Sequence, residues 1–276
     1  MTIYLSTNPD GGNTEGIGAM VQSQLFTKAL SQLFNCNYIF RGFKNFTHYQ
    51  YFDITQERFM DDINHLFNLY ENETVRPEKI SVSSEDEFKK FVSRQSDSNL
   101  ELELDPGLVI KLGQQYLQEF EKHGFIKQIK NRFNLKQENR KNDFIIAVHI
   151  RKFTKTDCDP SSFRDYFSKE KEDYYLNLVD GLREKYKSKN PKFQIYSQGS
   201  IEDFSFLKAE DTSFFIEEYP LDSFEKMLYS DVFVMANSSL SYIVHLLRDK
   251  ITYCKTGFYH KTYENLKMFI GYDGLI

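Results

Sequence analysis

The chain has 276 residues, which is enough for one large domain or for two ordinary domains with separate hydrophobic cores. Hydrophobic residues make up 40% of it and charged residues 27%, a globular composition that excludes a largely disordered chain. The net charge of −5 excludes an overall basic field that recruits nucleic acid or an anionic membrane, so any bound anion must meet a local cluster of positive charge.

The N-terminus lacks the basic start and the apolar stretch of a secretory signal peptide. No run of apolar residues approaches the roughly 18 that a membrane-spanning helix needs. The cysteines Cys36, Cys158 and Cys254 are odd in number and widely spaced, which favours reduced thiols over disulfides or a metal site. These features predict a cytoplasmic protein with no transmembrane segment.

The first half begins with a predicted strand at residues 3–6, a Gly-rich turn at 9–18 and a helix at 17–34. In this helix, apolar residues recur every three or four positions from Met20 to Phe34. A second strand is expected at 37–40. Further helices are then predicted at residues 56–70, 85–92, 108–120 and 126–133. The polar segments 73–84 and 93–106 are interpreted as loops.

The segment LKQENRKND at residues 135–143 is the most polar stretch of the chain. A polar stretch of this kind between patterned regions is typical of a domain boundary. We therefore expect two domains, at residues 1–141 and 142–276.

The second half alternates between strand and helix patterns. Strands are predicted at residues 144–150, 193–197, 213–216, 232–236 and 251–253. Helices are predicted between them, at residues 171–186, 201–207, 221–229 and 239–248. This alternation predicts an α/β fold with a parallel, doubly wound sheet that carries helices on both faces. Ligands of such sheets bind beyond the carboxyl ends of the strands.

Three of these strands end in polar residues, which would meet at one rim of the sheet. They are His149 and Arg151 after the first strand, Ser197, Gln198 and Gly199 after the second, and Asn237, Ser238 and Ser239 after the fourth. A helix N-terminus with hydroxyl side chains suits phosphate oxygens, and an arginine adds a bidentate charge that fits a diphosphate. The alternative for residues 237–239 is an ordinary helix N-cap.

Three stretches of the second half resemble three motifs of the GDP-fucose-dependent fucosyltransferase superfamily, in the same order. They are HIRK at 149–152, YSQGS at 196–200 and ANSSLSYIVHLL at 236–247. That superfamily includes α1,2-, α1,6- and protein O-fucosyltransferases. The region from Gly12 to Leu30 is similar to the Gly-rich opening loop and helix of the family. The resemblance implies a GT-B-like fold, in which two Rossmann-like domains face a cleft. Residues 1–141 would bind the acceptor, and residues 142–276 the nucleotide sugar.

The resemblance also implies an inverting glycosyltransferase that transfers a sugar, first of all fucose from GDP-fucose, to a glycan hydroxyl. At the matching positions, Arg151 would hold the diphosphate and His149 would support its loop, while Ser238 and Ser239 would contact the phosphates or nucleoside. We add Lys155, Gly12 and Asn13 to the donor-binding set. The chain departs from the family motifs at three positions. Lys152 replaces the usual Arg, Thr154 replaces the usual Asp, and Gln198 stands where an acidic residue is common. These departures leave open which nucleobase and which sugar the donor carries.

Catalysis would need a base near the acceptor hydroxyl and a cation near the leaving diphosphate. In α1,6-type enzymes a carboxylate about ten residues past the motif histidine is thought to be the base. That spacing points to Asp159, with Asp157 two residues earlier, and Arg151 would supply the positive charge. Two alternatives stay open: both carboxylates are solvated loop residues, or Asp157 and Asp159 form an Asp-x-Asp metal site. The cationic cluster favours a reaction without a metal or other cofactor.

Two other functions fit the same residues. The chain could use another donor, such as UDP- or GDP-linked xylose, on the same fold. It could also be a non-catalytic nucleotide-sugar or glycan-binding protein, which the departures at Thr154 and Gln198 favour mildly.

Among the remaining histidines, His245 lies in a predicted helix and is expected to be a core or interface residue. No nucleic acid partner is expected.

Overall fold

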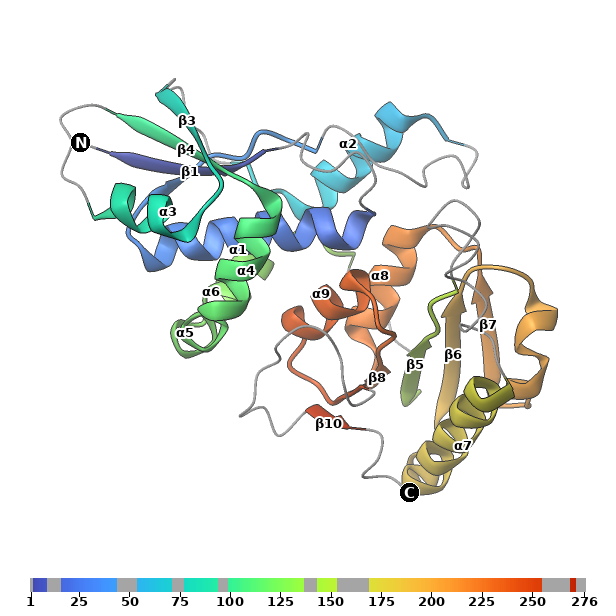
Figure 1. Cartoon of the computed structure of the whole chain (residues 1–276). Helices are drawn as coiled ribbons and strands as arrows, with labels where there is room; N and C mark the ends of the chain where they lie inside the picture. The colour runs from blue at the N-terminus through green and yellow to red at the C-terminus, as the bar shows by residue number, and fades with distance from the viewer. Residues whose placement is uncertain are drawn as a thin grey trace. The chain divides into compact units, whose positions relative to one another are not determined.

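The computed structural model describes residues 2–8, 16–43, 54–70, 77–93, 99–136, 143–152, 169–254 and 269–271. The chain divides into two compact units, Met1–Leu135 with His260–Tyr263, and Lys136–Tyr259 with Glu264–Ile276. Each unit contains a parallel sheet flanked by helices (Figure 1). This confirms the predicted α/β class. The boundary predicted between residues 141 and 142 falls outside the described residues, and the predicted cleft stays a prediction.

The described elements of the first unit are, in chain order, β1 Ile3–Thr7, α1 Ile17–Leu33, β2 Asn37–Tyr38, α2 Gln56–Phe67, β3 Glu78–Val82, α3 Glu85–Val92, β4 Leu100–Leu104, α4 Pro106–Gln115, α5 Leu117–His123 and α6 Phe125–Lys130. The sheet order is β2-β1-β4-β3, and every pairing is parallel. Helix α1 lies along one face of this sheet (Figure 1). Gly113 lets α4 approach α1 closely, because a Cβ atom there would lie 2.0 Å from the Phe26 ring.

The interpretation of residues 73–84 and 93–106 as loops is wrong, because these segments contain β3 and β4. The β4 sequence LELEL alternates with the period of a strand, yet all five residues are buried. Glu101 accepts hydrogen bonds from Arg41 and from the Ser6 hydroxyl at 2.7 Å, and the Lys79 ammonium lies 2.9 Å from Glu103. Pairing of this kind allows carboxylates to occupy a central strand, since a buried charge needs a partner.

The other helices and strands predicted for the first half are present with small shifts of their ends, and most of the Gly-rich turn predicted at 9–18 lies outside the described residues. One exception is the single helix predicted at 108–120. It is divided at Tyr116 into α4 and α5, since the Tyr116 backbone (φ −99°, ψ 13°) departs from helical geometry. Thr55, Ser84 and Asp105 cap the N-termini of α2, α3 and α4, and each side chain accepts a backbone N–H. Such caps satisfy donors that the first helical turn leaves unpaired.

The described elements of the second unit are β5 Ile145–His149, α7 Lys169–Lys185, β6 Lys192–Ser197, β7 Thr212–Ile216, α8 Pro220–Tyr229, β8 Val232–Val234, α9 Ser239–Leu247, β9 Thr252–Cys254 and β10 Phe269–Gly271, with short 3-10 helices η3 Lys187–Lys189 and η4 Ile201–Leu207. The strand order is β10-β9-β8-β5-β6-β7, and all pairings are parallel. This confirms the predicted sheet and adds β10, which we did not predict.

The side chains of β5 alternate between the two faces of the sheet. Ile146 and Val148 belong to an apolar cluster with Leu178 and Leu182 of α7. Figure 1 draws α7 on one side of the sheet and α8 and α9 on the other. The last residue of β5, His149, therefore lies on the face that α9 covers, where it bonds to this helix.

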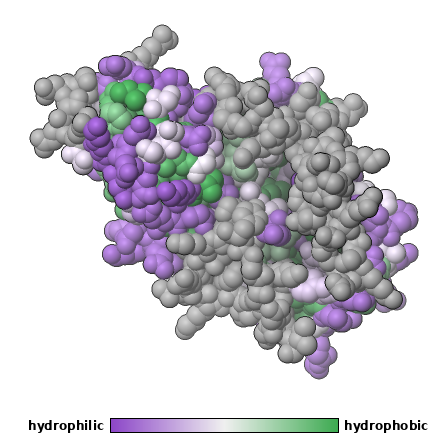
Figure 2. Space-filling view, viewed as in Figure 1, coloured by the Kyte–Doolittle hydropathy of each residue, from purple (hydrophilic) through white to green (hydrophobic). Residues whose placement is uncertain are grey.

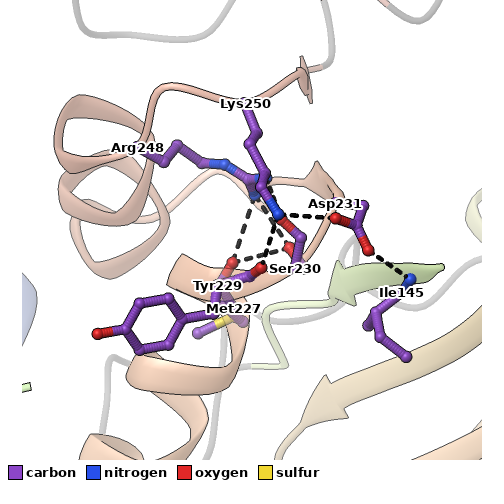
Figure 3. A network of polar contacts seen from close by, with 7 residues as sticks. All are labelled: Ile145, Met227, Tyr229, Ser230, Asp231, Arg248 and Lys250. Atoms are coloured by element: carbon purple, nitrogen blue, oxygen red, sulfur yellow. Dashed lines mark hydrogen bonds and ion pairs between the residues drawn. The ribbon is translucent and has the colours of Figure 1, made fainter. Parts of the chain in front are cut away.

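A polar network holds the opposite, amino-terminal end of β5 (Figure 3). It joins Ile145, Met227, Tyr229, Ser230, Asp231, Arg248 and Lys250. The buried Arg248 guanidinium donates to the carbonyls of residues 227 and 230 at 3.3 and 2.8 Å, so a cation lies at the C-terminus of α8, where the helix dipole favours it. Asp231 accepts the Ile145 N–H at 2.9 Å, and the network thereby fixes where β5 begins.

No described helix is long and apolar enough to cross a membrane. The described surface on the left of Figure 2, where Figure 1 draws α3, is largely hydrophilic. Helix α3 carries an ion-pair cluster in which the Glu85 carboxylate lies 2.6 Å from Lys89 and 3.2 Å from Lys111 of α4. These pairs are exposed and contribute little to stability.

Candidate functional site

The strand order of the second unit defines where a ligand is expected. Numbered along the chain, its strands follow the order of a dinucleotide-binding Rossmann sheet, with β5 first and β8 fourth. The order therefore reverses between the neighbours β5 and β8. In open α/β sheets, ligands bind outside the carboxyl ends of the strands at this point. The two segments that follow the carboxyl ends of β5 and β8 at this point are residues 150–152 and 235–239.

A hydrogen bond crosses this point of reversal. Nδ1 of His149, the last residue of β5, lies 2.5 Å from the hydroxyl of Ser241 in the first turn of α9. Both side chains are buried. Burial, aided by the nearby Arg151 charge, lowers the pKa of His149 to about 3, so the imidazole is neutral at physiological pH.

The start of α9 is capped as well as polar. The Ser238 hydroxyl accepts the Ser241 N–H at 3.2 Å, which is the N-cap arrangement that we kept as an alternative. Asn237 is exposed, and Ser238 and Ser239 are half-buried. The N-cap does not preclude a phosphate site, because the dipole of α9 still places partial positive charge at this end.

The tip that follows β6 is bonded to the end of β5. Arg151 donates a hydrogen bond to the amide oxygen of Gln198, and the Ser197 hydroxyl donates to the Ile150 carbonyl at 2.6 Å. Lys152 forms an ion pair with Asp203 in η4. These contacts place the Arg151 guanidinium beside the tip of β6, at the same rim as His149.

Gly199 is required by the shape of this tip. Its φ is +108°, and an added Cβ would lie 2.7 Å from both Asp203 Oδ2 and Lys152 Nζ. Its N–H donates to the Glu217 carboxylate at 2.6 Å. Glu217 is itself in the left-handed region, with φ +56°. In this structure, Ser197 and Gly199 thus use their donors inside the protein and shape the rim.

The structure thus brings His149, Arg151 and the residues 197–199 and 237–239 to one rim of one sheet. Lys155, Asp157, Asp159, Gly12 and Asn13 lie outside the described residues, and their roles stay predictions. Sequence reasoning missed Ser241, Asp203 and Glu217. The first two have a signal, because Ser241 follows the N-cap residue by one helical turn and Asp203 stands three residues after Ser200, as in a capping box. Glu217 has none.

Other chemistry has little support among the described residues. They contain no group of three or more His, Cys, Asp or Glu side chains that could hold a metal ion. Cys36 and Cys254 are free thiols, whereas Cys158 lies outside the described residues, and burial raises the pKa of Cys36 to about 11 and that of Cys254 to about 12. Thiols that hold their protons so firmly are poor nucleophiles. His245 is buried, in agreement with its predicted place in the core.

Comparisons with known proteins found solved structures to which this chain is similar. No family model matches it, and no curated protein matches its sequence. Its structure is similar to POFUT1 in complex with GDP, with a TM-score of 0.43 and 14% identity over 91% of this chain and 98% of that chain. It is similar in the same way to POFUT1 in complex with GDP-fucose, with a TM-score of 0.41 and 14% identity over 90% of this chain and 94% of that chain.

Proposed function

We propose that the chain is a glycosyltransferase that binds a nucleoside-diphosphate sugar at the carboxyl ends of β5 and β8 and transfers the sugar to a glycan hydroxyl. The observation that supports this most strongly is the coincidence at one point of the sheet. The strand order reverses there, a neutral buried histidine joins β5 to α9, and Arg151 follows the same strand. That is the place and the charge that a diphosphate requires in an open α/β sheet.

The proposed donor is GDP-fucose, because the motifs at 149–152, 196–200 and 236–247 resemble those of GDP-fucose-dependent enzymes. Arg151 would hold the diphosphate through two parallel N–H bonds, and the N-terminus of α9 would face its oxygens. Both contacts strengthen as charge develops on the leaving nucleoside diphosphate. They therefore stabilise the transition state more than the bound donor.

We propose an inverting reaction in which a carboxylate takes the proton of the acceptor hydroxyl, with Asp159 as the base and Asp157 as its alternative. Arg151 and Lys155 would supply the positive charge that a divalent cation supplies in other glycosyltransferases. The reaction would then proceed without a metal. Turnover that is unchanged in EDTA is the expected result, and a loss that Mn²⁺ restores would favour the Asp-x-Asp metal site.

A nucleotide screen tests this function directly. We expect GDP and GDP-fucose to raise the melting temperature more than UDP, ADP or UDP-xylose, because a ligand at a hundred times its dissociation constant adds about 2.7 kcal/mol of stability. Incubation with GDP-fucose and candidate glycans should then release GDP. Preference for UDP would change the donor, whereas binding without release of GDP would indicate a binding protein. Stabilisation by none of these nucleotides would contradict the proposal.

A further inference from the structure

Ser241 makes two hydrogen bonds through one buried hydroxyl. Its side chain is fully enclosed, with an exposed fraction of 0%. The oxygen lies 3.1 Å from the backbone nitrogen of Ala236, two residues after β8, and 2.5 Å from Nδ1 of His149. The hydroxyl therefore connects the two strands between which the sheet order reverses.

The chemistry of these partners fixes where the hydrogens lie. The Ala236 N–H can only donate, so it occupies a lone pair of the Ser241 oxygen and leaves the hydroxyl hydrogen to find an acceptor. Among the described residues, His149 Nδ1 is the acceptor in contact with it. A buried hydroxyl without an acceptor would carry the cost of an unmade hydrogen bond. The hydrogen therefore points to Nδ1, which must be unprotonated.

We propose that Ser241 is a positioning residue that holds His149 as the neutral tautomer with its hydrogen on Nε2. The imidazole then offers an N–H donor, without a full charge, to an anion bound at the carboxyl ends of β5 and β8. The assignment of the tautomer stands on the contacts of Ser241 alone. The role of Nε2 toward phosphate oxygens rests on the proposed function.

The surroundings favour the same state. Burial and the Arg151 charge lower the pKa of His149 to about 3, which disfavours the imidazolium. A hydrogen on Nδ1 would leave the Ser241 hydroxyl hydrogen without an acceptor. Nε2 is not one of the fully enclosed, unpartnered polar atoms of the described part of the chain. The proposed function places the bound anion against this nitrogen.

Helix α9 holds Ser241 in place. The Ser238 hydroxyl accepts the Ser241 N–H, and the Ser238 carbonyl accepts the Tyr242 N–H at 3.0 Å. The hydroxyl of Ser241 is thus held at a fixed distance from the end of β8. This explains why two serines three residues apart begin this helix: the first caps it, and the second orients a histidine on the neighbouring strand.

Nitrogen NMR of the ligand-free full chain tests the assignment. With ¹⁵N-histidine labelling, the ring signals of His149 are identified by their loss in His149→Gln. We expect an unprotonated Nδ1 and a protonated Nε2 in the wild type between pH 6 and 8. Protonation at Nδ1, or of both nitrogens, would overturn the proposal. This NMR measurement does not depend on whether variants of Ser241 fold.

Variants of Ser241 extend the test. Ser241→Ala should populate the Nδ1–H tautomer, whereas Ser241→Thr, which retains a hydroxyl, should keep the wild-type signals. Ser230→Ala is the matched control, because Ser230, like Ser241, is a fully buried serine with a hydrogen-bonded hydroxyl. The Ser230 hydroxyl donates to the Met227 carbonyl at 2.8 Å. It should lose stability without changing the His149 tautomer. An unchanged tautomer in a folded Ser241→Ala protein would contradict the role of Ser241.

Titration with GDP separates this inference from the proposed function. Ser241→Ala should weaken GDP binding by roughly five- to twenty-fold, the effect of one misdirected hydrogen bond, while Ser230→Ala leaves it unchanged. If the wild type does not bind GDP, the proposed function fails, and the tautomer is judged by NMR alone. If the wild type binds GDP and Ser241→Ala binds it equally well, Nε2 does not contact the ligand.

Discussion

Arg151 donates a hydrogen bond to the side-chain amide oxygen of Gln198, so the residue after β5 is oriented by the tip of β6. The acceptor is a neutral amide at a position where fucosyltransferase motifs commonly have an acidic residue. Gln198 can therefore fix the direction of the guanidinium without adding a negative charge beside a bound diphosphate.

Gln198→Glu should weaken the binding of GDP while the fold is retained. The new carboxylate would keep the hydrogen bond to Arg151 and would repel the diphosphate by about 1–2 kcal/mol, which corresponds to roughly five- to thirty-fold in affinity. Calorimetric titration at low and high salt measures this, and the loss should shrink at high salt. Gln128→Glu, an equal charge change in the first unit, should have no effect. Equal or tighter binding by Gln198→Glu would show that Gln198 does not act through Arg151.

Gly199→Ala should destabilise the protein more than Gly124→Ala. Both glycines have positive φ, +108° and +66°, but an added Cβ meets nothing within 4 Å at Gly124 and lies 2.7 Å from Asp203 Oδ2 at Gly199. The Asp203 carboxylate has little freedom to move, because it accepts the Ser200 N–H at 2.8 Å. We expect a cost of about 1 kcal/mol at Gly124 and about 2–3 kcal/mol at Gly199 in chemical denaturation. Equal costs would mean that the tip can rearrange.

Stability should fall as the pH drops from about 6.5 toward 3. Burial lowers the pKa of His149 and of His245 to about 3, so the unfolded chain binds protons in this range that the folded chain does not. The contribution of each histidine is complete above the unfolded pKa of about 6.5 and is lost below it, at about 1.4 kcal/mol per pH unit. His245→Gln should lower the slope of unfolding free energy against pH by about that amount between pH 4 and 6. Above pH 7, the wild type and His245→Gln should show the same slope. A slope between pH 4 and 6 that is the same in both proteins would contradict the neutral state of His245.

Asp159→Asn should reduce turnover by about 10² to 10⁴ and leave the affinity for GDP nearly unchanged, since a general base acts on the acceptor proton. Single-turnover kinetics with GDP-fucose, together with a GDP titration, separate the two effects. Asp157→Asn is the control from the same segment. Sensitivity at Asp157 alone would move the role by two residues. If neither substitution slows transfer, neither carboxylate is the base.

The second unit was predictable from the sequence because its strands are short apolar runs followed by polar residues, and its helices have regular apolar spacing. The parallel arrangement then places the ends of β5, β6 and β8 at one rim, which the sequence order already implied. β10 was missed because Phe269–Gly271 ends in glycine, a residue that strands disfavour.

The first unit was harder to predict because β3 and β4 contain charged residues. In β4, Glu101 and Glu103 alternate with leucines, and their burial depends on Arg41, Ser6 and Lys79, which are distant in sequence. Local propensity disfavours such a strand, and tertiary pairing overrides it. Glu217 was missed for a related reason: its bond to Gly199 exists only after β6 and β7 pair. Long-range contacts of this kind leave no local sequence signal.

The most direct measurement of nucleoside-diphosphate binding at the end of β5 is calorimetric titration of GDP into the wild type, Arg151→Lys and Arg151→Ala, with Arg183→Ala as the control. Arg183 is an arginine of the same unit that pairs with Asp211 at 2.7 Å, away from the proposed ligand. We expect Arg151→Ala to weaken binding by roughly 10- to 100-fold and Arg151→Lys to recover only part of the loss, because a point charge cannot form the bidentate pair. Arg183→Ala should bind GDP as the wild type does. Binding of GDP that is equal in the wild type and Arg151→Ala, or that is lost equally in Arg183→Ala, would contradict a diphosphate site at Arg151.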